Sequence, residues 1–270
     1  MKFTLLLLSL ILFQNSQGQP KVFQDSLAQF SYLLYGSTVL NKENQTTKVQ
    51  GSQATGFFIK KSERTYFVTA RHAVTNFIDK AAKRNEFPEN YNVYSHYSDP
   101  FNFIPIPPFW VTDKSKIKVG LKSPDIFVYE VTDKLNDFPI SIVDLDDKHS
   151  DFTSANSRYA EIRLCGFPEN MNRIENERIQ ISPPYMFTTK NFIITENFIN
   201  QIGNERGIDS FRYEIQIKDW RVNLGLAGFS GAPVFIKSRE GKWEFLGILV
   251  AINQIRNSIY VAKRNWILAE

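Results

Sequence analysis

One segment of the sequence carries the residue types that could turn a side-chain hydroxyl into a nucleophile. Ser230 lies in the run Gly-Phe-Ser-Gly-Ala-Pro that begins at Gly228. A serine hydroxyl attacks a carbonyl only when an adjacent base accepts its proton. The two glycines beside the serine allow a tight turn that can aim backbone N–H groups at a developing oxyanion. The same run also suits an ordinary glycine–serine turn between two strands, so the segment needs a base to be chemically meaningful.

A base for such a serine must come from one of three histidines, His72, His96 and His149. His72 follows an apolar run that ends at Ala70, and a helical pattern begins directly after it. The end of a strand holds a side chain rigidly while leaving it within reach of solvent. His72 is therefore the favoured base, although a histidine at an ordinary strand-to-helix junction would look the same.

An acid that orients the base is suggested at Asp125, which follows Pro124 and opens an apolar run. Its carboxylate could accept a hydrogen bond from the imidazole Nδ1–H and so fix the tautomer of the base. An aspartate after proline is more often a simple turn residue. Asp144, Asp146 and Asp147 are rival acids, but they crowd a polar stretch.

The elements that must hold these residues read mostly as short strands. Helical periodicity is confined to Ser26–Tyr35, Ala73–Lys83 and the last few residues. Many short strands between turn residues predict an all-β barrel or sandwich. The expected strands are Thr55–Ile59, Thr65–Thr69, Ile126–Val131, Glu161–Cys165, Phe211–Ile217, Ala232–Phe235, Phe245–Ala251 and Ser258–Ala262.

Residues 84–122 differ from the rest because Asn85–Pro108 holds five prolines among many aromatic residues. The composition predicts a long insertion or surface loop between strands. Internal repeats and low-complexity tails are not found in the sequence.

The first eighteen residues predict a secretory signal peptide. Lys2 precedes the apolar run Phe3–Phe13, and Ser16-Gln17-Gly18 offers small residues around a cleavage point. The apolar run is too short to remain as a membrane-spanning helix. After cleavage we therefore expect no stable membrane anchor.

Cysteine usage narrows the expected compartment. Cys165 is the single cysteine, so an internal disulfide is impossible, and its apolar surroundings predict a small buried residue. An exported chain of this kind is typical of the bacterial periplasm or of a bacterial secreted protein.

Charge and ligand content exclude several classes of function. The 270-residue chain has a net charge of +4 and no run of five like charges, so we expect no nucleic-acid partner. Three scattered histidines and one cysteine make no metal-ligand set, and we expect no cofactor.

The three segments, in the order His, Asp, Ser, together resemble the chymotrypsin/trypsin-like serine peptidases. The run from Thr69 to His72 resembles the Thr-Ala-x-His box, and Asp125–Val128 resembles the Asp-(Ile/Val)-Ala-(Leu/Val) box. The run from Gly228 to Pro233 resembles the Gly-(Asp/Asn)-Ser-Gly-Gly-Pro box. The resemblance covers about residues 50–262 and implies two six-stranded antiparallel β-barrels with the active site between them.

The resemblance also implies site roles. His72 would be the general base, Asp125 its orienting acid and Ser230 the nucleophile, with the N–H groups of Gly228 and Ser230 as the oxyanion hole. It implies a secreted serine endopeptidase that acts on polypeptide substrates through an acyl-enzyme. Gly247–Asn253 resembles the strand that pairs with the substrate backbone.

The expected domain organisation has three parts. Residues 1–18 form the signal peptide, and 19–49 form an N-terminal segment with a short helix. Residues 50–270 form the peptidase domain, with one barrel at about 50–135 that contains the insertion. The second barrel covers about 155–265.

Departures from the family pattern refine the expectation. Phe229 stands where the family has an acid or amide, and the Ile-Val-Gly-Gly start of zymogen-type members is absent. The chain is therefore most similar to bacterial Deg-type heat-stress proteases, here expected without a PDZ module. Leu224, Val250, Ala251 and Ile252 align with the primary pocket, which implies a preference for apolar or small P1 residues.

A non-catalytic role is the alternative. The bulky Phe229 could distort the oxyanion turn and leave a binding protein of the same fold. Such a protein would hold a peptide or protein partner in the barrel cleft or on the aromatic segment Asn85–Trp110.

Overall fold

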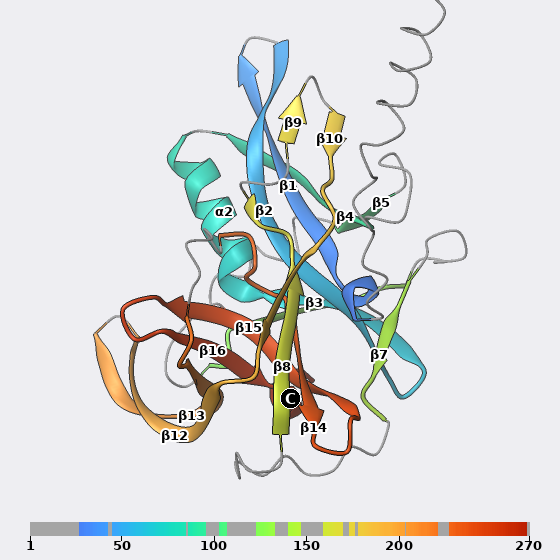
Figure 1. Cartoon of the computed structure of the whole chain (residues 1–270). Helices are drawn as coiled ribbons and strands as arrows, with labels where there is room; N and C mark the ends of the chain where they lie inside the picture. The colour runs from blue at the N-terminus through green and yellow to red at the C-terminus, as the bar shows by residue number, and fades with distance from the viewer. Residues whose placement is uncertain are drawn as a thin grey trace, which may run out of the picture.

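The computed structural model describes residues 27–42, 45–84, 86–95, 103–106, 123–132, 140–146, 159–169, 173–175, 178–202, 204–220 and 227–268. The expected signal peptide lies outside these residues, as do Leu224, His96 and His149. Within the described residues, two seven-stranded sheets account for most of the chain. In Figure 1 the blue-to-green first sheet stands above the orange and red strands of the second.

The first sheet has the strand order β5-β4-β1-β2-β3-β6, and β7 adds to the edge of β2 opposite β3, past the residues that pair with β1. The β2–β7 pair is parallel, whereas the other pairs are antiparallel. Its strands are β1 (Tyr32–Lys42), β2 (Gln45–Lys61), β3 (Arg64–Ala70), β4 (Phe87–Tyr94), β5 (Phe103–Ile106), β6 (Ile126–Glu130) and β7 (Ile142–Asp144).

The second sheet is antiparallel throughout and has the order β11-β8-β14-β15-β16-β13-β12. A separate two-stranded ribbon consists of β9 (Arg173–Glu175) and β10 (Arg178–Gln180). The strands of the sheet are β8 (Tyr159–Gly166), β11 (Tyr185–Thr189), β12 (Phe192–Ile202), β13 (Glu205–Ile217), β14 (Pro233–Ser238), β15 (Trp243–Asn253) and β16 (Ser258–Lys263).

The all-β class expected from the sequence is confirmed: the described residues are nearly all-β and form two large sheets. Each sheet has seven paired strands among the described residues, where six were expected. The helix expected after His72 is also confirmed, as α2 (Arg71–Lys83). No helix of the described residues is long and apolar enough to cross a membrane.

The helix expected at Ser26–Tyr35 is wrong. A single 3₁₀ turn, η1 (Ala28–Phe30), is followed directly by β1. Tyr32, Leu33, Leu34 and Tyr35 are all buried, because β1 lies inside the sheet and both of its faces are covered. Apolar residues without a gap fit a strand buried on both sides, and here that burial outweighs the weak helical spacing.

Two expected boundaries are also corrected. The first sheet begins at Tyr32 with β1, so the N-terminal segment at 19–49 is largely part of the first β unit. The supposed insertion at 84–122 contributes β4, which pairs with β1, and β5, which pairs with β4. Pro105 sits in β5, at the edge of the sheet, where a missing N–H is tolerated. Residues 85, 96–102 and 107–122 lie outside the described residues.

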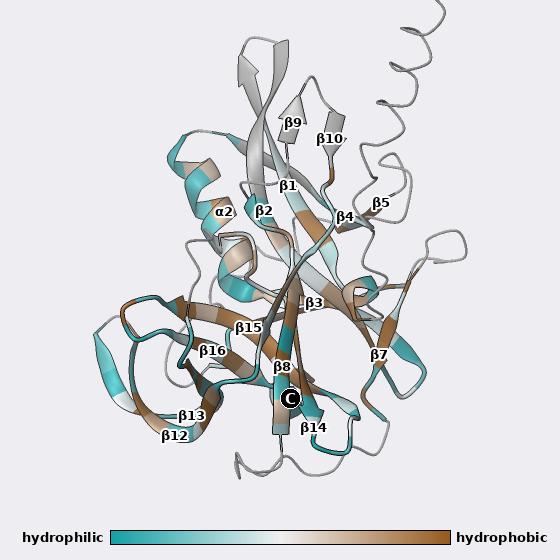
Figure 2. Ribbon diagram, in the orientation of Figure 1, coloured by the Kyte–Doolittle hydropathy of each residue, from teal (hydrophilic) through white to brown (hydrophobic). Residues whose placement is uncertain are grey.

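The two sheets pack against each other through a shared hydrophobic core. Phe57 of β2 and Phe245 of β15 belong to one buried cluster, and their ring centroids lie 5.2 Å apart. Hydrophobic residues run along β14, β15 and β16 in Figure 2, while the outer surface of α2 is more hydrophilic. Because close-packed cores resist displacement, the strand ends that meet between the sheets are held in fixed relation.

Candidate active site

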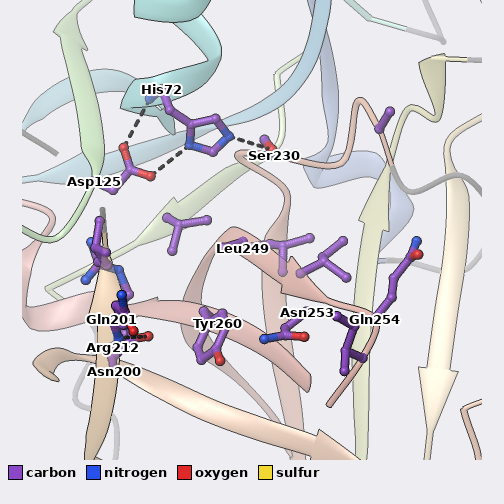
Figure 3. Close-up of a pocket in the computed structure, with 16 residues that line it drawn as sticks. His72, Asp125, Asn200, Gln201, Arg212, Ser230, Leu249, Asn253, Gln254 and Tyr260 are labelled. Carbon is purple, nitrogen blue, oxygen red and sulfur yellow. Dashed lines mark hydrogen bonds and ion pairs between the residues drawn. The ribbon is translucent and has the colours of Figure 1, made fainter. Parts of the chain in front are cut away.

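Both sheets contribute to a cluster of three side chains at their junction. His72 lies in the first turn of α2, Asp125 directly precedes β6, and Ser230 lies in the turn before β14. His72 Nδ1 is 2.8 Å from Asp125 Oδ2, and His72 Nε2 is 2.9 Å from Ser230 Oγ (Figure 3). The structure thus brings together the three residues selected from the sequence.

The hydrogen-bond partners assign the tautomer of His72. A carboxylate only accepts hydrogen bonds, so the Nδ1 that faces Asp125 carries the proton. The Nε2 lone pair then faces Ser230 and can accept its hydroxyl proton. An imidazole in this state is able to act as a general base toward the serine.

Asp125 also completes the first turn of α2. Its Oδ1 accepts the backbone N–H of His72 at 3.1 Å, and its carbonyl accepts the N–H of Arg71 at 3.0 Å. The first N–H groups of a helix have no partner within the helix, and an anion there is favoured. Asp125 is only 5% exposed, so these bonds offset the cost of burying its charge.

The backbone at Asp125 adopts a left-handed conformation with φ of 58°. A non-glycine residue in this region is strained and persists only where its surroundings enforce it. Arg71 supplies part of that support, because its Nε donates to Ile126 O and its Nη1 to Ser123 Oγ. Arg71 was not identified from the sequence, where it occupies only the variable position of the histidine box.

The serine turn requires glycine at position 231. Gly231 has φ of 92°, and a Cβ there would lie 2.0 Å from Thr55 O and 2.2 Å from Thr69 Oγ1. This close approach lets the Thr55 N–H donate to Ser230 O at 3.0 Å. The turn is therefore fastened to β2 of the first sheet, which places Ser230 opposite His72.

The peptide groups beside Ser230 are oriented by their carbonyls. Ala227 O accepts the N–H of Glu169, and Phe229 O accepts the N–H of Ala232, both at 2.8 Å. In a trans peptide the N–H points opposite to the carbonyl, so the N–H groups of Gly228 and Ser230 point away from these partners. Neither of the two N–H groups has a hydrogen-bond partner within the described part of the chain.

Phe229 lies in the core of the second sheet. Its side chain is 0% exposed and packs with the cluster around β8, β14 and β15. A Cβ on Gly166 would lie 2.6 Å from the Phe229 ring, so the glycine makes room for it. The aromatic residue before the serine thus fills a core space, and it is not among the residues that line the cleft.

A cavity of about 720 Å³ opens beside the three residues. Val250, Ala251 and Ile252 of β15, which the sequence placed in a pocket, line it together with Leu249 and Ala227. Leu224, the fourth predicted pocket residue, lies outside the described residues.

Polar side chains from β12, β13 and the end of β15 also line the cavity, and they were not identified from the sequence. Asn200 and Gln201 come from β12 and Arg212 from β13, while Asn253 and Gln254 follow at the end of β15 (Figure 3). In the sequence these polar residues lie in runs typical of ordinary strands, which give no indication of a site. Asn200, Gln201 and Arg212 reach the cavity because β12 and β13 form a hairpin beside it.

Tyr260 of β16 also lines the cavity. Its ring stacks on Phe198 with centroids 5.5 Å apart. Burial raises the pKa of Tyr260, so its phenol stays protonated near neutral pH, and its hydroxyl donates to Glu214 Oε1 at 3.4 Å.

No model of a protein family and no curated protein matches the chain. Solved structures with a similar chain course include a catalytically inactive tobacco etch virus protease complexed with substrate, which is 14% identical. That match covers 89% of this chain and 81% of the other, with a TM-score of 0.38.

Two further similar structures are Glu endopeptidase in complex with MPD and the serine endoprotease from Yersinia pestis. The first is 12% identical, covers 87% of this chain and 86% of the other, and has a TM-score of 0.41. The second is 12% identical, covers 88% of this chain and 60% of the other, and has a TM-score of 0.43.

Proposed function

We propose that the chain is a serine endopeptidase that hydrolyses peptide bonds through an acyl-enzyme. The observation that carries this proposal is the continuous contact from Asp125 through both nitrogens of His72 to Ser230. Ser230 Oγ attacks the peptide carbonyl while His72 Nε2 accepts its proton. Asp125 stabilises the imidazolium, which then gives the proton to the leaving amine. Water, activated by the same histidine, releases the acid product.

The N–H groups of Gly228 and Ser230 would stabilise the tetrahedral intermediates. Their peptide groups are fixed by Glu169 and Ala232 before any substrate arrives. Donors that need no reorientation stabilise developing charge most effectively, because their cost is met in folding. Phe229 anchors this turn from the core side, which speaks against the alternative that it distorts the turn.

Ser230, and not a thiol, is the proposed nucleophile. Cys165 is the single cysteine of the sequence, and it lies in β8 with 0% exposure. A thiol held there has no access to solvent or to a substrate.

The substrate backbone would pair with β15. The ladder between β14 and β15 ends at Ile248, while β16 stays paired with β15 to Asn253. Val250–Asn253 therefore has one edge directed at the cavity, and an extended peptide could add to it as a strand. The apolar Val250 and Ile252, with the small Ala251, support a preference for apolar or small P1 residues.

Cleavage of a peptide library tests the proposal. Wild type should cleave with apolar or small residues at P1, and Ser230→Ala should abolish cleavage. Ser238→Ala, which removes a hydroxyl from the end of β14, should cleave like wild type. A library that wild type leaves intact, or that Ser230→Ala still cleaves, would reject the peptidase.

Export, a bacterial periplasmic or extracellular location and the Deg-type resemblance remain proposals. They rest on the apolar run Phe3–Phe13 and on the residue pattern around Phe229. Amino-terminal sequencing of the protein from its native host should start near Gln19. A mature chain that still begins at Met1 would contradict export by a cleaved signal.

A further inference from the structure

An arginine of the second sheet reaches the turn that carries Asp125. Arg212 Nη2 donates to the carbonyl of Ser123, two residues before Asp125, at 2.6 Å. The side chain is 3% exposed, and it lines the cavity beside Asn200 and Gln201 (Figure 3). A long cationic side chain is buried this completely only where its charge and donors are matched.

Asp209 matches the charge and fixes the direction of the arginine. Its Oδ2 accepts Arg212 Nη1 at 2.8 Å and Asn200 Nδ2 at 2.9 Å. Its Oδ1 accepts the backbone N–H groups of Phe211 and Arg212. With four donors, this fully buried carboxylate is satisfied, and the guanidinium plane is set by it.

A β-bulge in β13 lies directly before Arg212. Between the register pairs Phe198↔Asp209 and Glu196↔Tyr213, β13 has three residues where β12 has one, Asn197. Such a bulge bends a strand and re-aims its side chains, and bulges are common beside functional sites. The bulge ends at Arg212, which continues into the ladder with β16 opposite Ala262.

We propose that Arg212 is a positioning residue through which the second sheet holds the Asp125 turn, and with it the His72 ring, in line with Ser230. The inference rests on the proposed peptidase function for its kinetic consequence. Arg71 secures the same turn from the first sheet, at Ile126 O and Ser123 Oγ. Arg71 and Arg212 thus hold the strained backbone at Asp125 from the first and the second sheet, respectively. The second sheet also carries Ser230.

The test compares Arg212→Lys with Arg163→Lys. Lysine can still neutralise Asp209, but it lacks the planar fork that reaches a second acceptor. Arg163 forms the matching control, because it pairs with Glu161 in β8 of the same sheet and is not among the residues that line the cavity. Two readouts are used: the low-field proton resonance of the His72 Nδ1–H and the rate of labelling by a fluorophosphonate probe.

Arg212→Lys should shift or broaden the His72 resonance and slow labelling by up to about 100-fold, as small misplacements of reacting groups do. Arg163→Lys should leave both readouts as in wild type. Should Arg212→Lys fail to fold, the double variant Asp209→Asn with Arg212→Gln removes both buried charges together and should give the same changes.

The outcomes separate the two proposals. If wild type is not labelled while Arg212→Lys still perturbs the His72 resonance, the positioning role stands and the peptidase fails. An unchanged His72 resonance in folded Arg212→Lys overturns the positioning role, whatever the labelling. An equal loss of labelling and resonance in Arg163→Lys overturns it too, because the effect would then be general to the sheet.

Discussion

Phe229 packs its ring onto the backbone of Gly166, at the point where the nucleophile turn meets β8. The ring is fully buried, and Tyr185 makes an edge contact with it at a centroid distance of 6.2 Å. Where the family pattern has a polar residue before the serine, this chain has a core residue. The turn that carries Ser230 is therefore anchored by packing.

Phe229→Ala should lower the free energy of unfolding by about 3–5 kcal/mol, because it leaves a cavity in a close-packed core. Urea unfolding followed by tryptophan fluorescence measures the change. Ile255→Ala, at an exposed side chain, is the control and should change the free energy of unfolding little. A loss below about 1 kcal/mol for Phe229→Ala would show that the ring does not anchor the turn.

Gly231→Ala should abolish labelling by a fluorophosphonate, because its Cβ would collide with Thr55 O and Thr69 Oγ1. Gly241→Ala is the matched control: it has a similar φ of 90° but nothing within 4 Å of the added carbon. The control should cost only about 1–2 kcal/mol of backbone strain and label normally. Equal effects of the two substitutions on labelling would refute the close-approach argument.

Thr55→Val should weaken the link between the sheets. Thr55 Oγ1 donates to Gly228 O at 2.8 Å and accepts the N–H of Phe167 at 2.9 Å. Valine keeps the shape of the side chain but leaves the Gly228 carbonyl and the Phe167 N–H without their partner. Each buried polar group left unpaired costs about 1–3 kcal/mol.

Thermal unfolding and the labelling rate measure this effect. Thr55→Val should lower the melting temperature and slow labelling. The same change at the exposed Thr195 of β12 should do neither. A melting temperature for Thr55→Val equal to that of Thr195→Val would contradict the role of the hydroxyl.

Alkaline pH should destabilise the fold through Tyr91. Burial raises the pKa of this phenol above its ordinary value of 10.0, and its hydroxyl donates to Val74 O. The folded state keeps a proton that the unfolded state loses, so this stabilisation is complete below pH 10 and decreases above it. The slope is about 1.4 kcal/mol for each pH unit for one such group.

Urea unfolding of wild type and Tyr91→Phe between pH 8 and pH 11 measures this contribution. The variant should be less stable at pH 8, since it lacks the bond to Val74, and should lose less stability above pH 10. Parallel curves for the two proteins across this range would show that Tyr91 ionises normally.

Sequence patterns located the chemistry better than the elements around it. His72, Asp125 and Ser230 each sit at the end of a short strand, and such ends carry strong local signals from turn residues and a sudden change in periodicity. β1, β4 and β5 were missed because their residues alternate weakly or include prolines. Their pairing is decided by the neighbouring strands and not by local propensity.

The supports of the site could not be predicted from local patterns. Arg212 occupies a run that reads as an ordinary strand, and its role depends on a bulge and on Ser123, 89 residues away. Arg71 and Thr55 likewise act through backbone atoms of distant segments. Contacts to backbone carbonyls leave no mark on the residue type of the partner, so only the folded chain reveals them.

Mapping of a covalent adduct tests most directly whether His72 and Asp125 activate Ser230. Folded wild type is treated with a fluorophosphonate, digested and analysed by mass spectrometry. We expect one adduct, on the peptide that contains Ser230, which is lost in His72→Ala and forms much more slowly in Asp125→Asn. Absence of the adduct from folded wild type, or an undiminished adduct in His72→Ala, would contradict this activation.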